Sequence, residues 1–149
     1  MLTLNDIFSK SNLNGSLKYL KTKPDTCGSD GMYLSDFEDY WKKNQNQIIE
    51  VILSGKYNFG PAVQHDILQK NGKTGRIAIF SVCDRLLLHT AADKLNAVLD
   101  KCFSKSSFAF RKGKGVMKAV EQAAKYIEEG NKYVVFADIK NYFDEIDHN

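Results

Sequence analysis

Five consecutive apolar residues at positions 133–137 lead directly into Asp138. All of them except Ala137 are β-branched or aromatic, which is typical of a strand buried on both faces of a sheet. A buried strand needs a neighbour at each edge to pair its backbone groups. Two weaker strand candidates, at 63–68 and 76–80, precede this run, and eleven residues follow Asp138. We therefore expect an α+β fold with an incomplete sheet, in a sequence that stops before the sheet is finished.

Helical periodicity accounts for most of the other apolar residues. Phe37, Tyr40 and Trp41 fall at helical spacing and are expected in the core. Asp84 is expected to be the N-cap of a long helix. The turn-rich segment 71–75 joins the two strand candidates as a hairpin. Helices are expected at 13–21, 37–54, 84–102 and 116–129.

Composition excludes several classes of protein. Of the 149 residues 43% are hydrophobic, yet no stretch approaches the roughly 18 uninterrupted apolar residues of a membrane span. The N-terminus lacks the basic region and apolar run of a secretory signal. Three widely spaced cysteines fit reduced thiols better than a disulfide framework or a zinc site. These features predict a soluble cytoplasmic protein without a membrane partner.

The net charge of +3 is mild, but its distribution is uneven. Residues 101–125 carry seven cations and one anion, whereas residues 126–149 carry six carboxylates and two lysines. A basic segment beside a carboxylate cluster suits a polyanion held next to a metal ion. The alternative is two solvated surfaces of opposite sign.

Asp138 is the leading candidate for a metal ligand. A carboxylate just past a buried strand is fixed by the sheet and exposed at its end, as a rigid ligand needs to be. Hard cations such as Mg²⁺ take oxygen ligands and leave room for phosphate oxygens. The alternative is that Asp138 is an N-cap for the next segment of the chain.

Residues 136–148 read Phe-Ala-Asp-Ile-Lys-Asn-Tyr-Phe-Asp-Glu-Ile-Asp-His. This stretch resembles the first catalytic-aspartate motif of reverse transcriptases, in the form found in group II intron-encoded enzymes and their bacterial relatives. Further similarities to that family occur upstream, in the family's order, so that the resemblance covers residues 12–149. They are Gly28-Ser29-Asp30-Gly31, Gly55-Lys56-Tyr57, Lys70-x-Gly72-x-x-Gly75-Arg76, Asp84-Arg85 and Ser107-Phe108-Ala109-Phe110-Arg111-Lys112-Gly113.

The resemblance implies the fingers and the start of the palm of a right-hand polymerase. Residues 1–104 would be the fingers-like region and residues 105–149 the beginning of the palm. Ala109 replaces the family's usual Gly, Lys112 its usual Pro, and Ser81 follows Ile79-Phe80 where Ile-Pro is common. The family's aromatic-x-Asp-Asp hairpin, which supplies the other catalytic carboxylate, is expected beyond residue 149.

The resemblance also implies roles for the residues of the aspartate motif. Asp138 would be a ligand to both Mg²⁺ ions of two-metal nucleotidyl transfer, and the backbone carbonyl of Ile139 would assist the second ion. Phe143 would lie under the incoming sugar and exclude a 2′-hydroxyl, which favours dNTPs. The alternative for Phe143 is an ordinary core residue.

Basic residues upstream match nucleotide-binding and nucleic-acid-binding positions of the family. Arg76 and Lys70 would contact the triphosphate of the nucleotide. Arg111, Lys112 and Lys114 would face template or primer phosphates, with contacts that carry no sequence information. For all five, the alternative is a solvated cation.

The expected parent is an RNA-directed DNA polymerase, a nucleotidyltransferase that adds dNMP to a primer 3′ end on an RNA template. Its partners would be RNA template, DNA primer and dNTPs. The 149-residue chain alone is expected to be inactive, because one carboxylate cannot hold two metal ions in the required geometry. The alternatives are a maturase-type module that binds structured intron RNA, a non-catalytic reverse-transcriptase-like protein of defence or diversity generation, and a decayed pseudo-enzyme. An unpaired edge of the sheet could also join two copies as a dimer, which would be an artefact of truncation.

Overall fold

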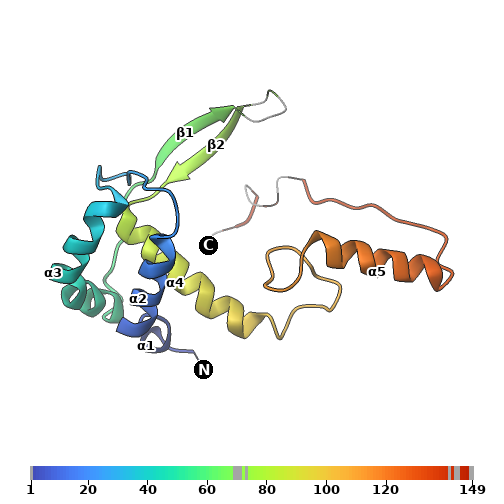
Figure 1. Cartoon of the computed structure of the whole chain (residues 1–149), viewed down its shortest axis with the longest axis horizontal. Helices are drawn as coiled ribbons and strands as arrows, with labels where there is room; N and C mark the ends of the chain where they lie inside the picture. Colours follow the sequence, from blue (N-terminus) through green and yellow to red (C-terminus); the bar gives the residue numbers. More distant parts are fainter. Residues whose placement is uncertain (1, 69–71, 73, 141, 143–144, 148–149) are drawn as a thin grey trace. The chain divides into compact units, whose positions relative to one another are not determined.

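The computed structural model describes residues 2–68, 72, 74–140, 142 and 145–147. The chain divides into two compact units, Met1–Cys102 and Phe103–Asn149 (Figure 1). The described residues form five helices and one two-stranded antiparallel hairpin, which confirms the predicted α+β class. No helix within these ranges is long and apolar enough to cross a membrane. The assignment of the chain to polymerase fingers and palm stays a prediction.

The first unit contains helices α1 (Leu4–Ile7), α2 (Lys10–Leu20), α3 (Leu34–Leu53) and α4 (Val82–Leu99). Three of them begin at a hydroxyl side chain, because the oxygens of Thr3, Ser9 and Ser81 accept backbone N–H groups of the first turn. The prediction that Asp84 caps α4 is wrong. Its backbone N–H donates to the Ser81 hydroxyl at 3.0 Å, so α4 starts three residues earlier. Ser and Asp are both good caps, and the sequence pattern did not distinguish them.

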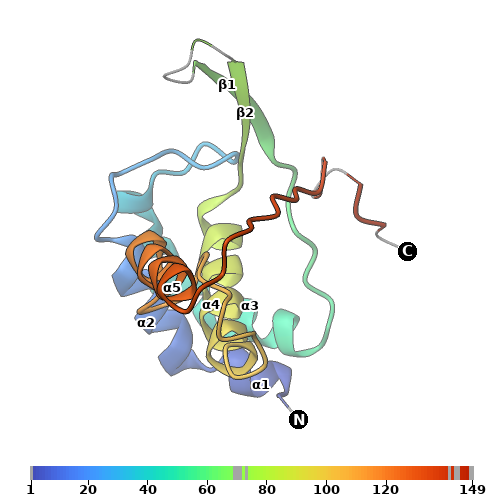
Figure 2. The same cartoon turned by 90° about the vertical axis from the view of Figure 1, so that its right-hand side faces the viewer.

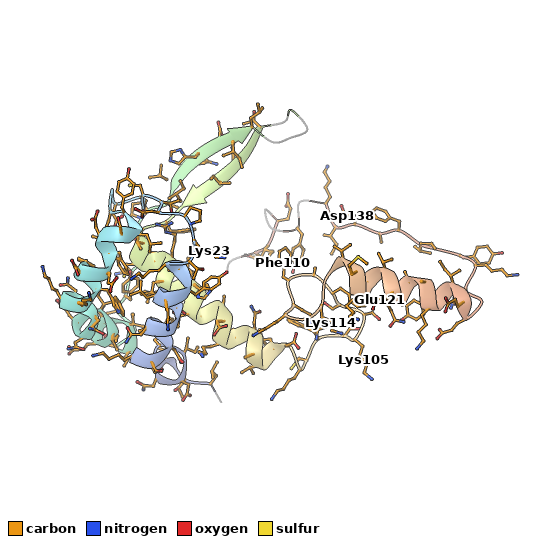
Figure 3. The ribbon with its side chains drawn as sticks, viewed as in Figure 1. Lys23, Lys105, Phe110, Lys114, Glu121 and Asp138 are labelled. Carbon is orange, nitrogen blue, oxygen red and sulfur yellow. The ribbon has the colours of Figure 1, made fainter. Side chains whose placement is uncertain are left out.

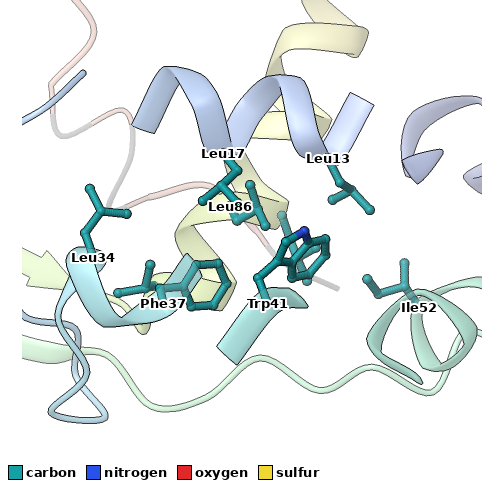
Figure 4. Close-up of a cluster of buried hydrophobic side chains, with 9 residues drawn as sticks. Leu13, Leu17, Leu34, Phe37, Trp41, Ile52 and Leu86 are labelled. Carbon is teal, nitrogen blue, oxygen red and sulfur yellow. The ribbon is translucent and has the colours of Figure 1, made fainter. Parts of the chain in front are cut away.

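The core of the first unit lies between α2, α3 and α4 (Figure 4). Burying one side chain of this size contributes about 1.5–3 kcal/mol, so the cluster holds the three helices together. The core positions predicted for Phe37 and Trp41 are confirmed, but Tyr40 is 40% exposed because it lies at the edge of the buried face of α3. The buried apolar residues are Leu13, Leu17, Leu34, Phe37, Trp41, Ile52, Val82, Leu86 and Leu87.

The hairpin of the first unit pairs β1 (Val63–Leu68) with β2 (Thr74–Ile79). The register runs from Val63 opposite Ile79 to Leu68 opposite Thr74. No side chain of either strand is buried, and the hairpin extends away from the helices (Figure 2). A two-stranded hairpin without a packed face is marginally stable in water. The hairpin is therefore the least supported regular element of the first unit.

The described residues of the second unit contain one regular element, helix α5 (Val116–Glu128). Gly115 precedes it and Gly130 follows it, and both glycines have positive φ values that L side chains rarely adopt. No residue of α5 is buried, and its apolar residues Val116, Met117 and Ile127 are each more than 60% exposed.

The predicted buried strand at 133–137 is wrong. Residues 131–139 have no regular secondary structure, and the side chains from Tyr133 to Phe136 are each between 90% and 95% exposed. The only sheet among the described residues is the β1–β2 hairpin of the first unit, so the run has no neighbouring strand there. Its composition is strand-like, but burial also requires neighbours that a local pattern does not supply.

Candidate nucleic-acid interface

Arg111 organises the loop that precedes α5. Its Nη1 donates to the backbone oxygens of Ser104 and Ser107, both at 2.8 Å. Its guanidinium also lies 5.5 Å from the centre of the Phe103 ring. These contacts use the side chain to hold the loop together. A phosphate contact by Arg111 stays a prediction.

Four of the seven residues that line a groove in the second unit are lysines. Its volume is about 440 Å³, and we refer to it as the lysine groove. The ammonium of Lys114 lies 5.5 Å from the centre of the Phe108 ring and donates to the backbone oxygen of Lys105 at 3.5 Å. Figure 3 labels Lys105, Lys114 and Glu121 around it. The lining residues are Lys105, Phe108, Lys114, Lys118, Glu121, Gln122 and Lys125.

One carboxylate, Glu121, is set against the four lysines of the groove. Lys118 donates to Glu121 at 2.8 Å, and this hydrogen bond raises the pKa of Lys118 above its ordinary value. Glu121 is therefore already paired with Lys118 in the structure. The remaining excess of positive charge in the groove favours an anionic ligand.

The groove also contains three functional candidates that were not predicted as a site from the sequence. They are Lys105, Lys118 and Lys125, which belong to the basic segment 101–125. Lys118 and Lys125 are seven residues apart, which is close to two helical turns, so α5 presents them on one face. That spacing was available from the sequence. The place of Lys105 beside them depends on the fold of the loop. Lys112, which was predicted to contact phosphates, is exposed but does not line the groove.

Phe110 is fully exposed and has a φ of +55°, in the left-handed region that non-glycine residues rarely adopt. The loop turns sharply here, since the backbone N–H of Lys114 donates to the oxygen of Arg111 at 3.2 Å. A fully exposed aromatic ring followed in the sequence by basic residues, here Arg111 and Lys112, is typical of surfaces on which nucleic-acid bases stack.

Asp138 and Ile139 lie in the irregular segment after α5, and both are exposed (Figure 3). Within the described residues no group of three or more His, Cys, Asp or Glu side chains could hold a metal ion. Asp138 is therefore not part of such a group in the described part of the chain. These residues do not by themselves fit a pair of Mg²⁺ ions, and we derive no metal-dependent step from them.

The predicted nucleotide-binding residues are only partly described. Arg76 lies on β2 opposite Asp66, with 3.8 Å between Nε and Oδ1 and 74% of its side chain exposed. An exposed ion pair of this kind contributes little to stability, so Arg76 is available for another partner. Lys70 and Phe143 lie outside the described residues. The roles of all three stay predictions.

Three segments that carry the family resemblance meet at the N-terminal end of α4. The Asp84 carboxylate accepts hydrogen bonds from the Tyr57 hydroxyl at 2.8 Å and from the Gly60 backbone N–H at 3.1 Å. Arg85 donates to the hydroxyl and to the backbone oxygen of Thr26, just before the 28–31 turn. A Cβ added at Gly28 would lie 2.9 Å from the backbone nitrogen of the first residue of α4, so the turn approaches this helix closely. The segment 55–57 thus contacts 84–85 directly, and the segment 28–31 contacts the first residue of the same helix.

No protein family model matches this chain, and no curated protein matches it. The resemblance to reverse transcriptases therefore depends on the quoted motifs and their order.

Proposed function

We propose that this chain is part of an RNA-directed DNA polymerase of the reverse-transcriptase type, and that its second unit binds phosphates of the template and primer. The lysine groove carries this proposal. It includes Lys114 and adjoins Arg111, which the motif resemblance assigns to nucleic-acid contacts. The parent reaction would be transfer of dNMP to a primer 3′ end on an RNA template.

The groove favours a polyanion on electrostatic grounds. Four lysines and one glutamate line the groove, with Lys118 paired to Glu121 and Lys125 to Glu129. A phosphate backbone gains attraction to the net positive charge and releases condensed counterions when it binds. For a single strand, the logarithm of the affinity falls with the logarithm of the salt concentration by about 0.7 per phosphate contact. Three lysine contacts therefore predict a slope of about −2.

Phe110 adds a contact that does not depend on charge. Stacking of one base on an exposed aromatic ring contributes about 1–3 kcal/mol and tolerates every base. Lysines on phosphates and a ring under a base carry no sequence information. We expect binding of single-stranded RNA with little preference for sequence.

The first test measures RNA binding by fluorescence anisotropy, with a labelled single-stranded RNA of about 20 nucleotides titrated at several salt concentrations. The variant Lys114→Ala/Lys118→Ala removes two groove cations. The control Lys43→Ala/Lys56→Ala makes the same charge change at exposed lysines outside the groove. We expect the groove variant to bind at least tenfold more weakly, with a slope reduced by about 1.4, and the control to bind like the unchanged chain. Equal losses in the two variants would refute a localised site.

The second candidate is an RNA-binding module without polymerase chemistry. It is favoured by one observation: the lysine groove does not include Asp138, so RNA binding does not need the carboxylate. We expect Asp138→Ala to bind RNA as tightly as the unchanged chain under either proposal.

The two proposals predict different sequences downstream of codon 149 in the transcript. An aromatic-x-Asp-Asp sequence within about the next hundred codons would support the polymerase. A stop codon there, or a corresponding hairpin without the paired aspartates, would favour the binding module. Primer extension by the purified 149-residue chain would contradict both proposals.

A further inference from the structure

Two of the residues that line the lysine groove carry no charge, Phe108 and Gln122. Of these two, only Gln122 can form hydrogen bonds through its side chain, because its amide has two donor hydrogens and an acceptor oxygen. A lysine ammonium only donates, and an ionised glutamate only accepts. Among the described residues that line the groove, Gln122 is therefore the one whose side chain can both donate to a ligand and accept from it.

Gln122 lies between two lysines on the same face of α5. Lys118 precedes it by four residues and Lys125 follows it by three, and residues at these spacings are neighbours on a helix surface. Along the helix axis, Gln122 is about 6 Å from Lys118 and about 4.5 Å from Lys125. Gln122 is half-buried and both lysines are exposed, so a strand held by the two ammonium groups would pass over the Gln122 amide.

The ion pairs that these two lysines form are weak. Lys118 lies 2.8 Å from Glu121, and Lys125 lies 3.9 Å from Glu129. All four side chains are at least half exposed, and exposed pairs of this kind contribute little to stability. A phosphate can therefore replace either carboxylate as the partner of a lysine at small cost.

The chemistry of the Gln122 amide matches that of a ribose. In a nucleic-acid strand each sugar links two consecutive phosphates, so the sugar between phosphates bound by Lys118 and Lys125 would face Gln122. The 2′-hydroxyl of a ribose is both a donor and an acceptor, and it is the group that distinguishes RNA from DNA at a given site. It can donate to Oε1 of Gln122 and accept from Nε2. A deoxyribose makes neither contact.

We propose that Gln122 is a specificity-determining residue that recognises a ribose 2′-hydroxyl, so that the lysine groove takes the RNA template and not the DNA primer. This inference rests on the proposed function, since it requires a nucleic-acid strand in the groove. It goes further by assigning the groove to one of the two strands.

The first experiment compares two oligonucleotides that differ only in their sugars. A labelled oligouridylate of about 20 nucleotides and the oligodeoxyuridylate of the same length have the same bases and the same phosphates. Fluorescence anisotropy with the full chain gives the ratio of their dissociation constants. A hydrogen bond changes an affinity by a factor of about two to ten, and we expect the RNA to bind more tightly by this factor. Equal affinities would overturn the inference and leave the proposed function, which Lys114→Ala/Lys118→Ala tests, in place.

The variant Gln122→Met tests the residue itself. Methionine is a good helix former of similar length, and the charge of the groove is unchanged. We expect the affinity for RNA to fall to that for DNA, with the affinity for DNA and the salt dependence unchanged. The control Gln47→Met makes the same replacement at an exposed position of α3 outside the groove, and it should keep the full preference for RNA. A preference that survives in Gln122→Met would overturn the role of Gln122.

A modified RNA tests the hydroxyl without any change in the protein. A 2′-fluoro oligouridylate keeps the sugar pucker of RNA but has no hydroxyl at this position. We expect it to bind the unchanged chain as weakly as the oligodeoxyuridylate does. Binding as tight as that of the RNA would show that the groove selects sugar conformation, and it would overturn the proposed hydrogen bonds. If the unchanged chain bound none of the three oligonucleotides, the proposed function and this inference would both be overturned.

Discussion

Replacing Asp84 tests whether the start of α4 holds the loop at 55–60 in place. Asp84 is 1% exposed, and its carboxylate accepts one hydrogen bond from the Tyr57 hydroxyl and one from the Gly60 backbone N–H. Asp84→Ala removes both acceptors. The first unit contains these three residues and the core between α2, α3 and α4, so the cost appears as a loss of its stability.

The magnitude can be worked out from the surroundings of the two donors. A hydrogen bond to a charged group contributes about 1.5–3 kcal/mol. The Tyr57 hydroxyl is partly buried, so the substitution loses the whole contribution of its hydrogen bond. Gly60 is exposed, so water can replace the Asp84 carboxylate as the acceptor for its backbone N–H. We therefore expect Asp84→Ala to lower the free energy of unfolding by about 2–4 kcal/mol. In a Tyr57→Phe background the same substitution should cost about 1.5 kcal/mol less, because one donor is already absent.

Urea unfolding followed by tryptophan fluorescence is a direct assay. Trp41 is the only tryptophan in the chain and is 2% exposed in the core of the first unit, so its signal reports unfolding of that unit. The control is Asp93→Ala, on the same helix, whose side chain is 63% exposed and which should change stability by less than about 0.5 kcal/mol. A change of similar size in the two variants would refute the argument that the Asp84 hydrogen bonds anchor the loop.

Three other outcomes are expected. Gly28→Ala should lower the free energy of unfolding by about 1–3 kcal/mol, because the added Cβ would press on the backbone of α4. Gly15→Ala, with open space around it in α2, should raise the free energy of unfolding by about 0.5–1 kcal/mol. Equal effects of the two substitutions in urea unfolding would contradict this reasoning. Ellman's reagent should react with the exposed Cys102 well before Cys83, since burial raises the pKa of the Cys83 thiol, and mass spectrometry of early adducts checks the order. Burial also raises the pKa of Tyr57. The folded state therefore holds the proton of the Cys83 thiol and that of the Tyr57 hydroxyl more tightly than the unfolded state does. Urea midpoints should therefore fall as the pH rises past the ordinary cysteine pKa, and midpoints that rise would show that the sign is wrong.

The helices and the hairpin could be predicted because their signals are local. Apolar spacing predicted 37–54 and 116–129, close to the observed Leu34–Leu53 and Val116–Glu128. The turn at 71–75 predicted the strand pair that the structure contains at Val63–Leu68 and Thr74–Ile79. The four-residue helix α1 was missed because its signal is one capping box, Thr3 with Asp6.

The failures concern features that depend on distant parts of the chain. The run 133–137 has strand composition, but its burial depends on partners that no local pattern specifies. The hydrogen bond that Asp84 accepts from Gly60, 24 residues earlier, could not be predicted from the residues next to Asp84. The lysine groove could be predicted only in part. The helical spacing of Lys118 and Lys125 is visible in the sequence, but the position of Lys105 beside them is not.

The uneven distribution of buried side chains makes the two units experimentally separable. Every side chain that the structure describes as buried belongs to the first unit, between Leu13 and Thr90. In native-state hydrogen exchange we expect the amides of α2 and α4 to exchange only on global opening, and those of α5 to exchange through local fraying at little cost. Melting of the first unit should not respond to alanine substitutions in the lysine groove. A loss of RNA affinity in those variants is then not caused by unfolding of the first unit.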